Sequence, residues 1–222
     1  MIRKIIISLL FISNIYAITF EDAKKIEEEF GLIEALSSYR TLAKQNDVKA
    51  LFRLAMVYSK NKPFEKNLTK THDLLKKASK LNYHKATYYL GKLYLSKKSP
   101  FYDLTDAYNS FLLAANENYA PAQNMIGQFL LSGILVDKDF KMAVKYFERA
   151  AKQNYINAQC NLSFMYASGK GVFPNLGRAH QFAKEGKEKG NKRCIKVWKD
   201  YKLANYPEDK GWKIGDYNKP SK

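Results

Sequence analysis

The residues that could do chemistry are few and widely spaced. The Ser-x-x-Lys pattern at Ser59–Lys62 is one in which a lysine can activate a serine nucleophile. It falls at the end of an expected helix, and no Ser-Asp-Asn or Lys-Thr-Gly motif completes a catalytic set. The three histidines, His72, His84 and His180, have no partners at ligand spacing, so we expect solvated surface positions for them. The sequence predicts no catalytic residue, no metal site and no cofactor.

Two short motifs have structural rather than chemical explanations. The stretch Asn67–Thr69 is an N-glycosylation sequon, with Glu65 two residues ahead of it,. Asn67 also stands where a helix should begin, so we expect its side chain to cap that helix instead. No strand is expected ahead of Gly169 and Gly171, which are therefore expected to be turn residues and not a phosphate loop.

The elements that would position these residues repeat with a fixed period of 36 residues. A first helix shows four such columns. The opening column is Ala50, Ala86, Ala122 and Ala158, and the second is Leu54, Leu90, Ile126, Leu162 and Trp198. The third column holds the small residues Ala55, Gly91, Gly127 and Ser163, and the fourth is Tyr58, Tyr94, Leu130 and Tyr166. Apolar residues at these offsets share one helical face, and the small column lets a neighbouring helix approach closely. Such a period is typical of a solenoid.

A second helix shows columns of its own at the same period. They are Ala35, Thr71, Ala107, Ala143 and Ala179, followed by Tyr39, Leu75, Phe111, Phe147 and Ala183, with Asn67, Asp103, Asp139 and Asn175 ahead of the helix. Asp and Asn side chains accept hydrogen bonds from the free amides of a first helical turn. The sequence therefore predicts a column of N-caps and an all-α chain of helix pairs.

Three stretches, Ala86–Tyr94, Gly169–Val172 and Ala150–Tyr155, resemble the Sel-one-like repeat (SLR) family, a relative of the tetratricopeptide repeats. The resemblance covers roughly residues 33–203. It implies an α-α superhelix, a solenoid of antiparallel helix pairs, and it is more specific for the fold than for a function.

The repeat register divides the chain into four parts. They are a signal peptide (1–17), N-terminal capping helices (18–49), the repeat solenoid (50–203, with units from 50, 86, 122 and 158 and a partial unit from 194) and a C-terminal tail (204–222). The capping part should hold a short acidic helix at Phe20–Phe30 and an in-register helix at Leu32–Lys44. In the tail, Trp212 either folds back over Trp198 or belongs to a disordered segment.

The first seventeen residues resemble a secretory signal peptide. Arg3 and Lys4 form a positive region, Ile5–Ile12 an apolar region, and Ala17 ends a passable cleavage site,. We therefore expect a periplasmic or secreted protein cut after Ala17, with an uncleaved anchor as the alternative. The formal net charge is +17. It favours acidic partners or a peripheral contact with envelope surfaces, or it keeps the protein soluble. Nucleic acid is not an expected partner of an exported chain.

The two cysteines, Cys160 and Cys194, fall on the first helices of successive repeats at different offsets. Neighbouring helix axes lie about 8–10 Å apart, whereas a disulfide needs Cα atoms within about 7 Å. This comparison favours two free, shielded thiols over a disulfide.

By analogy with related repeats, the first helices line a concave face. The side chains expected to point into this groove or to rim it are Phe52, Met56, Tyr88, Lys92, Asn124, Gln128, Cys160, Phe164, Lys49 and Lys85. Aromatic, amide and lysine side chains on one surface suit a protein or peptide segment, including an acidic one,. The resemblance thus implies a monomeric scaffold for protein–protein interactions in the bacterial envelope.

A β-lactamase-like or penicillin-binding activity is the alternative, because cysteine-rich members of the family are described in those terms. Their motif places two cysteines in each repeat, at positions that here carry pairs such as Ala151 and Ala158 or Lys187 and Cys194. Cys194 lacks its mate, and the departure puts this activity in doubt.

Overall fold

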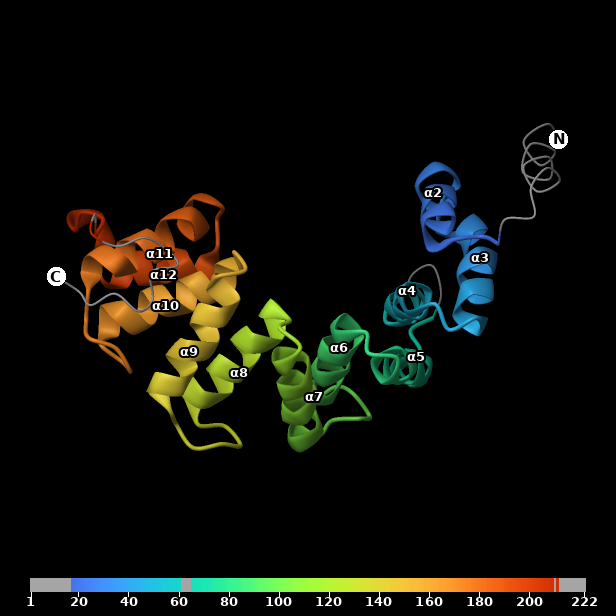
Figure 1. Cartoon of the computed structure of the whole chain (residues 1–222), viewed down its shortest axis with the longest axis horizontal. Helices are drawn as coiled ribbons and strands as arrows, with labels where there is room; N and C mark the ends of the chain where they lie inside the picture. Colours follow the sequence, from blue (N-terminus) through green and yellow to red (C-terminus); the bar gives the residue numbers. More distant parts are fainter. Residues whose placement is uncertain (1–16, 61–64, 210, 212–222) are drawn as a thin grey trace. The chain divides into compact units, whose positions relative to one another are not determined.

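The computed structural model describes residues 17–60, 65–209 and 211, and within them it contains α-helices, one short 3-10 helix and no strand (Figure 1). The helices are α2 (Phe20–Phe30), α3 (Leu32–Lys44), α4 (Val48–Tyr58), α5 (Leu68–Lys80), α6 (His84–Leu95), α7 (Leu104–Asn116), α8 (Ala120–Ser132), α9 (Phe140–Ala151), α10 (Ile156–Ser168), α11 (Leu176–Glu188), α12 (Lys192–Asp200) and the 3-10 helix η1 (Leu203–Asn205). The predicted all-α fold of helix pairs is confirmed, and so are the bounds of α2 and α3.

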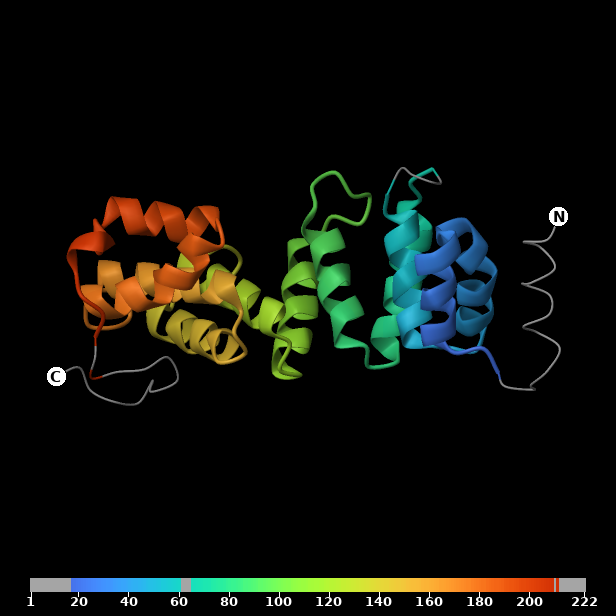
Figure 2. The same ribbon diagram turned by 90° about the horizontal axis from the view of Figure 1, so that it is seen from above.

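The chain forms two compact units, which meet in the sequence between Asn82 and Tyr83. Unit 1 contains α2–α5, and unit 2 contains α6–α12 with η1. In unit 1, α4 packs against α5; in unit 2, α6 packs against α7, α8 against α9 and α10 against α11, as antiparallel pairs (Figure 2). The 36-residue period of the sequence therefore corresponds to one helix pair.

The predicted column of N-caps is confirmed. The side chains of Asn67, Asp103, Asp139 and Asn175 each accept a hydrogen bond of 2.8 Å from the backbone amide three residues further on. Each bond satisfies an amide that the first helical turn leaves free. The Asn67 side chain is thus engaged as a cap, as expected for the sequon.

A second column governs the return turns and was not recognised in the sequence. Asn46, Asn82, Asn118 and Asn154 follow one another at 36 residues and have φ angles of 66°, 60°, 60° and 59°. Asparagine is one of the few residues that enter this left-handed region readily. These asparagines therefore end α3, α5, α7 and α9 at the same point, and Gly190 takes the corresponding position after α11.

The small column of the first helices faces the bulky column of the second helices. A Cβ atom at Gly127 would lie 2.5 Å from Cε1 of Phe147, and one at Gly91 would lie 2.9 Å from Cε1 of Phe111. Both phenylalanines are fully buried. The predicted close approach of the paired helices is therefore confirmed, and it depends on a glycine opposite each ring.

The C-terminal segment packs against α11 as far as the structure describes it. Leu203 is fully buried, and its carbonyl oxygen lies 2.9 Å from Nδ1 of His180. Arg178 donates from Nε to the Asp209 carboxylate at 3.0 Å, and Gln181 donates to the Asp209 carbonyl. The predicted tail is thus bound to the last helix pair up to Asp209, whereas Trp212 lies outside the described residues.

The expectation of free thiols is wrong, because Cys160 and Cys194 form a disulfide that joins α10 to α12. Their Cα atoms are 4.7 Å apart. The helices come this close because α11 carries Gly186 at the contact, where a Cβ atom would collide with the Cys194 sulfur. The average distance between helix axes was therefore a poor guide to the local distance between α10 and α12.

Gly127→Ala should destabilise the fold by about 1–3 kcal/mol, because the added methyl group overlaps the Phe147 ring. Phe147→Leu in the same chain should recover part of the loss, since the corresponding columns pair Ala55 with Leu75. Urea unfolding of both single variants and the double variant measures this coupling. Strictly additive losses would contradict the proposed contact.

Replacing both cysteines by alanine should lower the free energy of unfolding by about 3–4 kcal/mol, the value expected for a closed loop of this length. Thermal unfolding with and without dithiothreitol measures the loss. The double variant serves as the control, because it should be insensitive to the reductant. Equal stability of the oxidised wild type and the double variant would contradict the prediction.

Glu148 on α9 should make the fold less stable as the pH rises. Burial raises the pKa of its carboxyl from an ordinary 4.5 to about 7, although Lys152 and Lys145 act in the opposite direction. The folded state therefore holds a proton that the unfolded state loses, so the contribution is complete below pH 4.5 and is lost as the pH approaches 7. Glu148→Gln should flatten the dependence of Tm on pH in this range, and an unchanged slope would contradict it.

Candidate functional site

The structure places the predicted groove residues on the first helices, in two separate units. Unit 2 carries Lys85, Tyr88 and Lys92 on α6, Gln128 on α8 and Phe164 on α10. Both lysines are exposed, and the other three side chains are half-buried. These five positions are accessible, and their role in binding stays a prediction.

Asn124 and Cys160 do not line an accessible surface. Cys160 is fully buried and belongs to the disulfide. Asn124 is 3% exposed, and its Oδ1 accepts a hydrogen bond of 2.6 Å from the amide of Asn161. The groove prediction is wrong for these two residues, because Cys160 is bonded to Cys194 on α12 and Asn124 is packed against Asn161 on α10.

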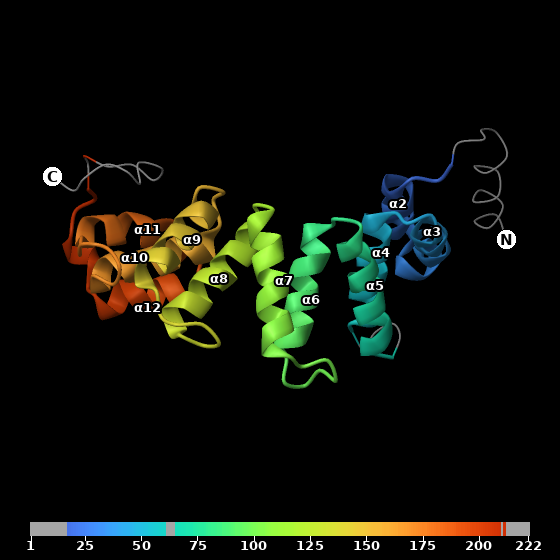
Figure 3. The same cartoon turned by 60° about the horizontal axis from the view of Figure 1, so that its bottom comes forward.

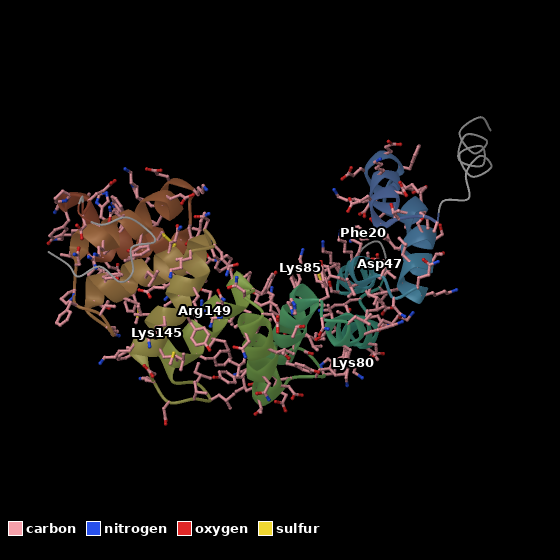
Figure 4. All side chains as sticks on the ribbon, in the orientation of Figure 1. Phe20, Asp47, Lys80, Lys85, Lys145 and Arg149 are labelled. Atoms are coloured by element: carbon pink, nitrogen blue, oxygen red, sulfur yellow. A yellow bond between two sulfur atoms is a disulfide. The ribbon has the colours of Figure 1, made fainter. Side chains whose placement is uncertain are left out.

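In unit 1 the predicted residues Lys49, Phe52 and Met56 lie on α4. Lys49 is engaged within the unit: its ammonium group is 3.4 Å from the Glu21 carboxylate and 5.5 Å from the centre of the Phe20 ring. Figure 4 labels Phe20 and Asp47 in this region. The start of α2 thus competes with any partner for this lysine.

The most concentrated aromatic surface in unit 2 is a group of five tyrosines, which we call the tyrosine cluster. It consists of Tyr83, Tyr88, Tyr89, Tyr119 and Tyr155. The Tyr88 ring lies 5.4 Å from the Tyr119 ring and 5.5 Å from the Tyr89 ring. Tyr155 is close enough to Tyr88 and Tyr119 to affect their pKa values. All five residues are half-buried.

The cluster is built on the repeat register. Tyr83, Tyr119 and Tyr155 occupy the N-cap positions of α6, α8 and α10 and are 36 residues apart. Sequence reasoning singled out Tyr88 but missed this column, although its spacing is visible in the sequence. The signal was overlooked because a tyrosine at an N-cap makes no capping hydrogen bond.

The electrostatics of the cluster combine neutral phenols with lysine. Burial raises the pKa of Tyr88 and of Tyr119 to about 12, so both hydroxyls keep their protons at neutral pH. The Lys92 ammonium lies 5.0 Å from the centre of the Tyr89 ring and 6.0 Å from that of Tyr88. Glu117 contributes an acidic group at the rim, 3.8 Å from Nε2 of His84.

A network of amides holds the neighbouring turn in place. Gln123 is fully buried and donates to the Asn118 side chain at 2.9 Å. Its own oxygen accepts from Gln153 at 2.9 Å, and Arg149 donates to the Ala115 carbonyl. The turn before Tyr119 is therefore fixed by α9, which gives the tyrosine cluster a rigid support.

The residues considered for catalysis have structural roles. Ser59 donates from its hydroxyl to the Met56 carbonyl at 2.8 Å at the end of α4, and Lys62 lies outside the described residues. The expectation of solvated histidines is wrong for His72, whose side chain is 12% exposed. It is also wrong for His180, whose ring packs 4.5 Å from that of Trp198.

Gly169 and Gly171 have φ angles of 69° and 73°, which confirms them as turn residues. The part of the chain that the structure describes contains no group of three side chains able to hold a metal ion. None of its helices is both long and apolar enough to cross a membrane.

Comparison with known proteins supports the repeat assignment. The family model described as Sel1 repeat matches residues 48–83, 120–155 and 156–191, and no curated protein matches the chain. The pair α6–α7 lies between matched repeats and keeps their period.

Two solved structures share the fold. A Sel1 repeat protein from Oxalobacter formigenes superposes with a TM-score of 0.76 at 24% identity, over 86% of this chain and 78% of that one. The protein c5321, a protective antigen present in uropathogenic Escherichia coli strains, gives 0.73 at 23% identity, over 84% of this chain and 41% of that one. Three stretches of the chain thus match the Sel1 repeat, and its fold is similar to that of these two solved proteins.

Proposed function

We propose that this protein is an exported scaffold that binds a segment of another protein at the tyrosine cluster of unit 2. Sel1-repeat proteins generally act as protein–protein interaction scaffolds and are typically not catalysts. The observation that carries the proposal is the gathering of five partly exposed tyrosines on three successive first helices.

Tyrosines suit this role for a physical reason. Each ring offers a large contact area with little conformational entropy to lose, and each hydroxyl adds a polar group for the partner. Tyr88 also packs 5.5 Å from the buried Phe111 ring, measured between ring centres. The cluster is therefore anchored in the core of unit 2, and its orientation is set before a partner arrives, which lowers the entropic cost of binding.

The charge at the cluster favours an acidic segment. Lys85 and Lys92 are exposed beside the rings, and the chain as a whole has a formal charge of +17. Complementary charge chiefly speeds the encounter with the partner and selects it. The rings of the tyrosine cluster, which the partner would cover, hold the bound segment. We propose that acidic and aromatic or aliphatic side chains alternate in the bound segment.

The location outside the cytoplasm rests on two observations. Residues 1–17 have the pattern of a cleavable signal peptide,. Cys160 and Cys194 form a disulfide, a bond that persists chiefly in oxidising compartments such as the periplasm. Both features support the proposed export.

Reversing the charges of two lysines at the tyrosine cluster should weaken binding of the partner. We expect Lys85→Glu combined with Lys92→Glu to weaken binding by about tenfold or more, as loss of an interface anchor does. Lys76→Glu combined with Lys80→Glu on α5, where both lysines are exposed, is the matched control; Figure 4 labels Lys85 and Lys80 on their different helices. The measurement is capture from envelope extract, identification by mass spectrometry and a Kd with the purified partner.

Tyr89→Ala tests the aromatic part separately, because the Tyr89 ring is half-buried and contacts Lys92. Loss of the partner in both cluster variants but not in the α5 control would support the proposal. Equal losses in the cluster and control variants, together with release by moderate salt, would reduce the interaction to a general basic charge and overturn it.

A further inference from the structure

A second surface of unit 2 lies at the loops that join the two helices of each pair. These loops comprise residues 96–103, 133–139 and 169–175, and together with the first turns of α7, α9 and α11 we call them the loop edge. In Figure 1 they leave the helices on the lower side of the view, and Figure 3 shows the first two on its lower side. The Lys170 ammonium lies 5.5 Å from the centre of the Phe140 ring, so the third loop contacts the start of α9.

Exposed apolar side chains collect at this edge. Tyr102 is 41% exposed, Ile134 52%, Leu135 48%, Met142 40% and Phe173 87%. The opposite turns of unit 2, at residues 117–119, 152–155 and 189–191, expose no large apolar side chain. The connections at one end of the helix pairs therefore expose large apolar side chains, whereas the turns at the other end do not.

Leu135 occupies a position that the fold would fill better with glycine. Its φ angle is 68°, and the residue one period later is Gly171 at 73°. A side chain in this left-handed region costs folding energy, and about half of the Leu135 side chain gains no burial in return. The loop therefore keeps an exposed leucine at the expense of its own stability.

Lysines surround these apolar tips. Lys97, Lys98, Lys138, Lys141 and Lys170 are all exposed on the loop edge. The acidic side chains of the edge are Asp103, Asp106, Asp137 and Asp139. Asp103 and Asp139 are N-caps, where the positive end of a helix compensates their charge.

We propose that the loop edge binds the surface of an anionic phospholipid bilayer, with Tyr102, Ile134, Leu135 and Phe173 entering the headgroup region and the lysines facing the phosphates. Separate protruding tips would need a matching pocket for each in a folded partner. A bilayer interface accepts apolar and aromatic side chains without such pockets, and lysine stems can extend along it. The inference uses the proposed export, which places the protein beside a membrane, but not the tyrosine cluster.

The test measures binding of residues 18–222, which contain every described helix, to phospholipid vesicles by flotation. Vesicles of phosphatidylethanolamine with phosphatidylglycerol are compared with vesicles of phosphatidylcholine alone. We expect binding to the anionic vesicles, and we expect Ile134→Glu combined with Phe173→Glu to lower the partition coefficient about tenfold or more. Leu113→Glu on α7, 53% exposed but away from the loop edge, is the matched control and should leave the coefficient unchanged.

Leu135→Gly separates membrane binding from folding. It should raise Tm by a few degrees, because the left-handed strain disappears, and still lower the partition coefficient several-fold. No binding to anionic vesicles, equal losses in the loop and Leu113 variants, or wild-type binding by the loop variant would each overturn the proposal. The proposal would also be overturned if the wild type formed an oligomer without binding vesicles and the loop variant did not form that oligomer. Intact vesicle binding alongside failed partner capture would overturn the proposed scaffold alone.

Discussion

The structure depends above all on how closely the two helices of a pair approach. That distance is set where a glycine on the first helix meets a phenylalanine on the second, as Gly127 meets Phe147. Each ring fills the space that the missing side chain leaves, so these contacts are closely packed. Interiors packed to this density tolerate little change in volume, and the period of the chain follows from repeating one such contact.

The parts of the fold that sequence reasoning predicted are those with local causes. Helix starts follow from a capping side chain and the amide three residues later, and the pairing of helices follows from apolar columns. Asp103 and Asp139 illustrate this, because their role depends only on their immediate neighbours. The Asn turn column was equally local and could have been found from its spacing alone.

The parts that could not be predicted depend on contacts between helices that are not paired. The disulfide required α10 and α12 to approach across Gly186, and no column of the sequence reports that distance. The same approach buries Cys160, and contact with Asn161 on α10 buries Asn124 on α8, so two residues do not belong to the expected groove. In unit 1, the ion pair between Glu27 and Arg53 ties α2 to α4, although α2 does not keep the repeat register.

The C-terminal segment has a consequence for how such an array can grow. Gly177 on α11 leaves room for the chain at Pro207, whose carbonyl oxygen would lie 2.8 Å from a Cβ atom there. Arg178, 6% exposed, is committed to Asp209. The outer face of the last pair is thus occupied by the chain itself and offers no template for another repeat. Duplication, natural or engineered, can lengthen this protein by inserting pairs ahead of α10 but not by appending them behind α12.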